Sequence, residues 1–449
     1  MRTKTSLLGG VAVGVLLAAV ATAPVQAKVV KKAAEASETQ KQIDDLREQL
    51  QFLKDRLDEQ AQISMKATND LKAAQAQADA AKAQAAQSAA VAQAAQAQAQ
   101  AEIKTIPAEV KSQVAAIKPP TSWADSTSVN GRMYYNLSSI EQKSNGARVA
   151  PSGVGFDVKR FYLGVDHKFD QTFSANLTTD FNYQSAIGQT SVFIKKAYLQ
   201  AKVSDALVLQ AGANDLPWIP FMEGLYGNRY VEQTIDDRLK YGTSSDWGLH
   251  ANGKFGPKNM FNYDVAVIDG AGYKAPLRSK EVDVEGRFNV NIDKFTVAVG
   301  GYTGQLGKNT VGATTFHTAS RLNLAGAYVD EHFRLGAEWF QATNWSNVTT
   351  AAADKSEGYS AFGTYYFMPK YAVFGNYQWA QPSKTVKPAT KTNYFNVGVS
   401  YSPTKIVDVA LVYKRDKIDA GSVSTGNGTI GGSSNGTYDE FGVFTQLRW

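Results

Sequence analysis

The chain has 449 residues and a formal net charge of +6, and it contains no cysteine. The lack of cysteine excludes disulfides, thiolate metal sites and a cysteine nucleophile. Beyond residue 120, basic residues exceed acidic residues by only three, which excludes the concentrated basic patch of a nucleic-acid-binding protein. Of the 49 Phe, Tyr and Trp residues, 48 follow residue 120. The first 120 residues therefore lack the large side chains of a globular core.

The N-terminus has the pattern of an export signal. Arg2 and Lys4 form a basic start, and an apolar stretch runs from Leu7 to about Ala23. Small residues at the first and last positions of Val25-Gln26-Ala27 suit signal peptidase, so residues 1–27 are predicted to be a signal peptide cleaved after Ala27. The alternative is an uncleaved membrane anchor. No later run approaches the roughly 18–20 apolar residues of a spanning helix.

Residues 28–120 are predicted to form a helical arm in the periplasm. Five apolar residues repeat at the heptad spacing of a coiled coil: Ile43, Leu46, Leu50, Leu53 and Leu57. From about Ala73 to Ala101 the chain is almost pure Ala and Gln, which favours a helix but offers little side chain to bury. Two interpretations stay open. The arm is either an oligomerising stalk or a solvated linker with one short coiled coil.

Residues 121–449 alternate between apolar and polar side chains with period two. The segment 173–183 places Phe173, Leu177 and Tyr183 on one face and Asn176 and Asp180 on the other. Segments of about ten such residues are typical of outer-membrane barrel strands. Tyr and Trp residues of the aromatic girdles fall near the predicted strand ends, as in Tyr135, Trp247, Trp339, Tyr365, Tyr401 and Trp449.

The connections between these segments alternate between short and long. Seven short turns fall at Asp166–Asp170, Ser204–Asp205, Gly256–Asn259, Asp293, Asp330–Glu331, Pro369 and Ser402–Lys405. Long polar stretches separate them, for example 141–153, 184–191, 214–243, 304–314, 343–356 and 417–436. Such alternation distinguishes short periplasmic turns from long external loops. We predict an all-β transmembrane barrel of 16 antiparallel strands, with both ends on the periplasmic side.

Three segments of the barrel resemble the phosphate-selective porin O/P family of Gram-negative outer membranes. They are Lys159-Arg160-Phe161-Tyr162-Leu163-Gly164, Ile194-Lys195-Lys196-Ala197-Tyr198-Leu199-Gln200 and Leu209-Gln210-Ala211-Gly212-Ala213-Asn214. The resemblance covers roughly residues 121–449. It implies a sixteen-stranded trimeric porin, and some members of the family carry an N-terminal coiled coil.

Strict alternation assigns charged side chains of the strands to the pore. The predicted pore-lining and selectivity residues of the strands are Arg132, Arg160, Lys196, Lys202, Arg287, Asp180, Asp283 and Glu285. Basic residues favour anions and acidic residues favour cations in such a pore. The mixture of both predicts a general pore with at most a mild preference for anions such as phosphate.

The long connection 214–243 is the candidate constriction. Its aromatic residues Trp218, Phe221, Tyr226 and Tyr230 would be unfavourable in water, so we expect it to fold into the barrel. Three further selectivity residues lie on it, Arg229, Arg238 and Lys240, opposed by Glu223, Glu232, Asp236 and Asp237. The alternative is a loop that latches one subunit to the next.

The sequence predicts no enzyme. Four histidines (His167, His250, His317 and His332) lack metal-ligand spacing, and no catalytic triad or phosphate-binding loop is present. We expect no cofactor and no metal.

The predicted function is an outer-membrane porin for passive diffusion of small hydrophilic solutes and ions. Its expected partners are outer-membrane lipid, two further copies in a homotrimer, and small ions or anionic solutes, with peptidoglycan contact through the arm and no nucleic acid. Two alternatives stay open. One is a structural tether between outer membrane and cell wall, in which conduction is incidental, and the other is a solute-specific anion channel.

Overall fold

The computed structural model describes residues 122–185 and 188–449, residues 50–58, and short helical fragments between residues 61 and 94. Its contacts separate two units, Met1–Lys118 and Pro119–Trp449. The predicted signal peptide 1–27 and most of the predicted arm 28–120 lie outside the described residues, so these assignments stay predictions. Residues 50–58 are helical, and the side chains of Leu50, Leu53 and Leu57 are exposed.

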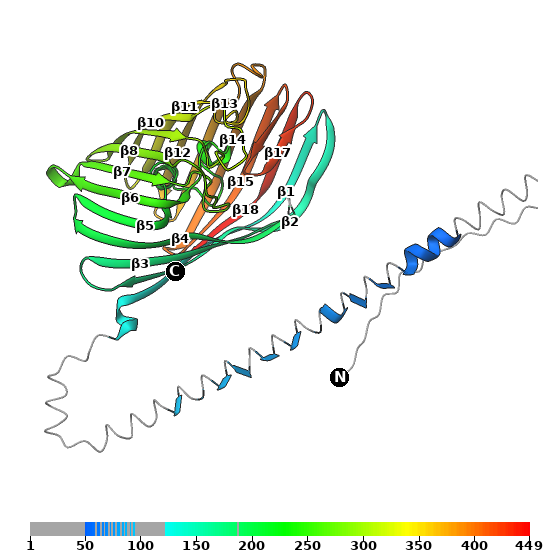
Figure 1. Ribbon diagram of the computed structural model, residues 1–449, viewed down its shortest axis with the longest axis horizontal. Coiled ribbons are helices and arrows are strands. Elements are labelled where there is room, and N and C mark those ends of the chain that lie inside the picture. Colours follow the sequence, from blue (N-terminus) through cyan, green and yellow to red (C-terminus); the bar gives the residue numbers. More distant parts are fainter. Residues whose placement is uncertain are drawn as a thin grey trace, which may run out of the picture. The chain divides into compact units, whose positions relative to one another are not determined.

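Over residues 122–449, sixteen antiparallel strands close into a barrel (Figure 1). This confirms the predicted fold class. The strands follow a short 3-10 helix η1 (Trp123–Ser126) and are β1 (Thr127–Ser144), β2 (Ala147–Lys168), β3 (Phe173–Gln184), β4 (Gln189–Ser204), β5 (Leu207–Asp215), β6 (Ser245–Phe255), β7 (Phe261–Ile268), β8 (Asp283–Ile292), β9 (Phe295–Gly304), β10 (Ala319–Val329), β11 (Phe333–Thr343), β12 (Lys355–Met368), β13 (Tyr371–Gln381), β14 (Lys391–Thr404), β15 (Val407–Asp419) and β18 (Gly436–Arg448).

The first and last strands close the barrel. Arg132 of β1 pairs with Tyr162 of β2 on one side and with Arg448 of β18 on the other. The terminal Trp449 exchanges backbone hydrogen bonds with Gly131, at N–O distances of 3.1 and 3.2 Å. Both ends of the barrel chain therefore lie at the same rim, which is the rim of the short turns.

All seven predicted short turns join consecutive strands, from the β2–β3 turn at 169–172 to the β14–β15 turn at 405–406. The 3-10 helix η3 (Pro257–Asn259) forms one of them. At the opposite rim, the longest connection joins β5 to β6 and contains α3 (Ile219–Tyr226) and α4 (Ile235–Arg238). The last connection contains a two-stranded sheet of β16 (Ser422–Thr425) and β17 (Gly428–Gly431).

Two of the predicted long loops are wrong. Residues 184–191 contain only a short connection, because β3 and β4 stay paired as far as Gln184 and Gln189. Residues 141–153 form no long loop, because β1 and β2 continue as a hairpin as far as Asn145 and Gly146. Both residues have positive φ, 51° and 83°, as a two-residue type I′ turn requires. The Asn-Gly pair in the sequence indicates this hairpin. The residues around the pair are polar, and for that reason the segment was predicted to be a long loop.

The strands have an apolar outside and a polar inside. On β3, Leu177 and Tyr183 are exposed, whereas Asn176, Asp180 and Asn182 are buried. An apolar exterior and a polar interior are the reverse of a soluble protein, and they are typical of a barrel surrounded by lipid. Aromatic pairs stack on the outside near strand ends, for example Tyr371 with Tyr401 and Phe333 with Tyr365, with ring centroids 4.8 and 5.0 Å apart.

Candidate functional site

The connection between β5 and β6, residues 216–244, is here called the inner loop because it packs against the inner wall of the barrel. Its α3 ends at Gly227, whose φ of 80° gives the left-handed cap that glycine favours. The aromatic side chains of Trp218, Tyr226 and Tyr230 are at most 4% exposed. The burial of these rings explains why the loop lies inside the barrel and does not extend into water.

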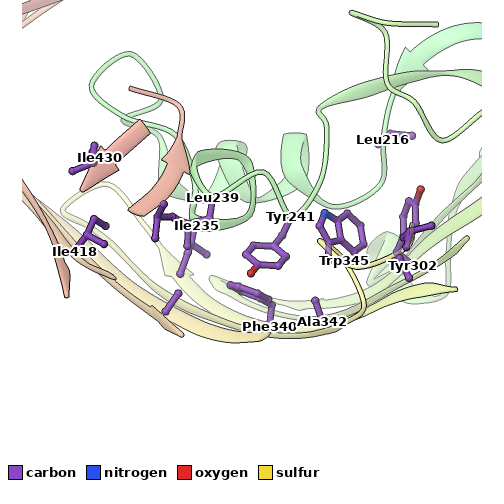
Figure 2. Packing of buried hydrophobic residues seen from close by; sticks show 14 of the residues in the cluster. Leu216, Ile235, Leu239, Tyr241, Tyr302, Phe340, Ala342, Trp345, Ile418 and Ile430 are labelled. Atoms are coloured by element: carbon purple, nitrogen blue, oxygen red, sulfur yellow. The ribbon is translucent and has the colours of Figure 1, made fainter. Parts of the chain in front are cut away.

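Apolar contacts hold the inner loop to the wall. Figure 2 shows Ile235, Leu239 and Tyr241 of the loop in one cluster with Phe340 of β11. The rings of Tyr241 and Phe340 lie 4.7 Å apart. On β9, Gly300 leaves room for a loop residue, since a Cβ atom there would overlap the ring of Trp218.

Hydrogen bonds link the loop to distant strands. The backbone N–H of Trp218 donates to the carboxylate of Glu285 on β8, at 3.0 Å, and Asn228 donates to the hydroxyl of Thr364 on β12, at 3.0 Å. Arg238 ion-pairs with Asp416 on β15, and both side chains are at most 1% exposed. Because these strands are spread round the barrel, the loop crosses its interior.

Two cavities lie on either side of the inner loop, and Arg229 lines both. The outer cavity, of about 430 Å³, is bordered by Gln184 and by residues 425–428 at the rim of the long connections. The inner cavity, of about 760 Å³, is bordered by Arg132 and Trp449 at the rim of the short turns. Arg229 therefore lies between the two cavities.

The guanidinium of Arg229 is held in place by two acidic residues of the same loop. It lies 2.5 Å from a carboxylate oxygen of Glu223 and 3.1 Å from one of Asp237. It also lies over the ring of Tyr134 on β1, 5.9 Å from the centroid. These three contacts hold the guanidinium at a defined point between the two cavities.

The walls of both cavities are predominantly basic. The outer cavity is lined by six basic and two acidic residues, namely Lys159, Arg160, Arg229, Lys240, Lys274 and Lys414 against Glu232 and Asp237. The inner cavity is lined by six basic and three acidic residues, namely Arg132, Lys195, Lys196, Arg229, Arg334 and Arg448 against Asp166, Asp215 and Glu223. Acidic side chains of the strands are instead buried against the wall, as in Asp180, Asp283 and Glu285.

Two β-bulges turn one lysine each toward these cavities. Strict alternation would place both lysines on the outer surface that faces lipid. On β2, Tyr134 pairs with Arg160 and the next pair skips Lys159. On β4, Thr178 pairs with Lys196 and the next pair skips Lys195. The skipped residue turns inward beside its neighbour. Sequence reasoning therefore missed Lys159 and Lys195, since no residue pattern in these segments marks a bulge.

Lys195 and Lys196 share one counter-ion. Their ammonium groups lie 2.6 and 3.1 Å from the two carboxylate oxygens of Asp215, at the end of β5. One carboxylate between two ammonium groups leaves a net positive charge on the wall of the inner cavity. Lys159 and Arg160 have more distant partners, since Asp157 and Asp180 lie 3.6 and 3.7 Å away.

The eleven predicted pore residues fall into three groups. Five line a cavity: Arg132, Arg160, Lys196, Arg229 and Lys240. Five lie inside the barrel but are engaged in contacts with the inner loop, another loop or the wall: Arg238, Arg287, Asp180, Asp283 and Glu285. Lys202 lies beside the β4–β5 turn, where its ammonium is 2.8 Å from Asp205, and it lines neither cavity. Alternation predicted the inward direction of the strand residues but not what they contact there.

Nothing in the described residues resembles a metal centre. They contain no group of three or more His, Asp or Glu side chains placed to hold an ion. His167 stacks on Trp123 at the rim of the short turns, with ring centroids 5.0 Å apart, and His332 is an exposed turn residue. Among the described residues, no helix is both long and apolar enough to cross a membrane.

The described barrel has the fold of outer-membrane porins. No family model matches the sequence, and no curated protein matches it either. Among solved structures, the anion-selective porin from Comamonas acidovorans is similar at 12% identity, with a TM-score of 0.56, over 72% of this chain and 99% of that chain. OmpF from Salmonella typhi, in complex with daunomycin, is similar at 10% identity and a TM-score of 0.50, over 72% of this chain and 97% of that chain. At these identities the likeness establishes the fold, and the resemblance to the porin O/P family stays a prediction.

Proposed function

We propose that this protein is a porin of the Gram-negative outer membrane that lets small hydrophilic solutes and ions diffuse passively, with a preference for anions. The apolar outside of the strands suits lipid, and the polar cavities suit water and hydrophilic solutes. The inner loop sets the size of the passage because it separates the two cavities.

The composition of the cavity walls carries the proposed anion preference. Taken together, the two cavities are lined by eleven basic and five acidic residues. The barrel sequence as a whole is nearly balanced, so the excess arises because acidic side chains of the strands are buried against the inner loop and other loops. Basic rings favour anions in a pore. The anion-selective porin named above is a precedent for this property on the same fold.

A planar-bilayer recording tests the proposal. The reversal potential in a KCl gradient gives the ratio of chloride to potassium permeability, and we expect chloride to be favoured. A subsequent titration with phosphate distinguishes a general anion pore from a phosphate-specific channel, since only a specific site gives saturating block of the chloride current. Potassium selectivity would contradict the proposal.

The tether alternative concerns the predicted arm, and deletion of residues 28–120 separates it from the porin. A porin retains its conductance after the deletion. A tether loses attachment of the outer membrane to the cell wall, which sedimentation of peptidoglycan sacculi measures. The predicted homotrimer is checked in the same preparations by cross-linking in detergent.

A further inference from the structure

The outer cavity contains polar groups that the protein itself leaves without partners. Among the described residues, the ammonium of Lys274 forms no ion pair, and the side-chain amides of Gln184 and Gln233 have no hydrogen-bond partner. Gln184 and Gln233 are only 8% and 9% exposed. Their amide atoms are not shielded from the cavity, so both amides are available to a solute there.

Several cations line the outer cavity, and Lys274 is one of them. Arg160 and Lys159 line the same cavity, and their carboxylate partners are more than 3.5 Å away. The ammonium of Lys274 lies beside two aromatic rings, 5.4 Å from the centroid of Phe193 and 5.6 Å from that of Tyr273. These cations fit a negatively charged group of a solute.

The two amides indicate what else the solute carries. An amide offers two N–H donors and one carbonyl acceptor. A simple anion accepts hydrogen bonds but cannot donate to the carbonyl oxygens, whereas a hydroxyl group does both. The hydroxyl of Ser244, at the wall of the same cavity, has no partner in the described part of the chain and adds a third group that both donates and accepts. A volume of about 430 Å³ suits a small molecule and not a polymer.

We infer that the outer cavity is a binding site for a small polyhydroxylated anion, that is, a sugar acid. Its acidic group lies at Lys274 and Arg160, and its hydroxyl groups lie at Gln184 and Gln233. This inference rests on the proposed porin function and specifies a solute class for it. The bound solute occupies the passage directly outside Arg229, so binding is visible as a block of the ion current.

The test uses the full-length protein in planar bilayers, with three solutes added on the side of the long connections. Glucuronate has both charge and hydroxyls, glucose has only hydroxyls, and propionate has only charge. We expect glucuronate to block the chloride current at a concentration about tenfold lower than either of the others, because it alone pairs with both the cations and the amides. Equal half-blocking concentrations for glucuronate and propionate, or for glucuronate and glucose, overturn the inference.

Variants locate the site. Lys274→Met is expected to raise the half-blocking concentration of glucuronate about tenfold, as loss of a hydrogen bond to a charged group implies. Gln184→Leu and Gln233→Leu are expected to raise it roughly threefold to tenfold and to leave block by propionate unchanged. Lys280→Met is the matched control, since Lys280 is on the same loop as Lys274 but lines a different cavity.

The chloride conductance of each variant reports whether the pore has folded. If the conductance persists and the variants bind glucuronate like the parent protein, the inference is wrong and the porin function stands. If the parent protein forms no channel, the proposed function itself fails.

Discussion

Arg238 on the inner loop and Asp416 on β15 form an ion pair that is shielded from solvent on all sides, since their side chains are 0% and 1% exposed. Arg238 also donates from Nε to the amide oxygen of Gln378 on β13, at 2.5 Å, and its guanidinium lies 4.5 Å from the ring centroid of Tyr394. A loop that begins at β5 is thereby attached to strands far from it along the barrel wall. The inner loop is therefore a fixed part of the pore.

Loss of this ion pair is expected to loosen the inner loop. Arg238→Met leaves Asp416 buried without a counter-ion, which typically destabilises a protein by about 3–5 kcal/mol. We expect a lower midpoint of unfolding in urea and a noisier single-channel current. The double variant Arg238→Met/Asp416→Leu removes both charges and is expected to recover most of the stability. If Arg238→Met has the same unfolding midpoint and the same current noise as the parent protein, the ion pair does not hold the loop.

Arg229 is expected to carry a large share of the anion selectivity. Arg229→Met removes a charge from between the two cavities and leaves Glu223 and Asp237 without their partner. We expect the permeability ratio of chloride to potassium to fall roughly threefold or more, measured from the reversal potential. Lys202→Met is the control, because Lys202 is bound to Asp205 at a turn and should leave the ratio unchanged. Equal ratios for the Arg229 variant and the parent protein would rule out this role.

Anion preference is expected to fall as pH rises through about 8. Burial in the cavity and the nearby Arg160 lower the pKa of Lys274 to about 8, with a smaller contribution from Arg229, although Asp180 and Asp237 act in the opposite direction. Above this pH the amine is neutral and the outer cavity loses a positive charge. Reversal potentials recorded from about pH 7 to about pH 9 measure the change. Lys274→Met should abolish this part of the pH dependence, and a flat profile in the parent protein contradicts it.

The bulge on β4 is expected to place two consecutive residues in the pore. Because the natural chain has no cysteine, a single introduced thiol reports its own accessibility without background. Lys195→Cys and Lys196→Cys should both react with a charged, membrane-impermeant thiol reagent and change the conductance. Ile194→Cys, which faces outward, should not react. A reactive residue 196 with an unreactive residue 195 would mean that regular alternation continues through this strand.

The sequence alone determined the architecture of the barrel. Period-two alternation and the seven short turns depend on neighbouring residues, so the strand number and the rim that holds both chain ends could be predicted. The same reasoning gave a wrong prediction at Asn145 and Gly146, which form a two-residue turn. The polar residues on both sides of this turn have the composition of a long loop. The aromatic residues of the inner loop were informative because large rings need burial wherever the loop lies.

Only the tertiary structure decided which charges face the pore. Asp283 and Glu285 alternate with apolar residues just as the residues that line the cavities do. However, the carboxylate of Asp283 accepts hydrogen bonds from the backbone N–H groups of Gln305 and Leu306. The carboxylate of Glu285 accepts one from the backbone N–H of Trp218. These partners come from loops remote in sequence. Lys159 and Lys195 enter the pore because of bulges, which depend on the pairing of whole strands. A sequence with nearly balanced charge thus forms cavities with basic walls, because folding buries more of its acidic than of its basic side chains away from the cavities.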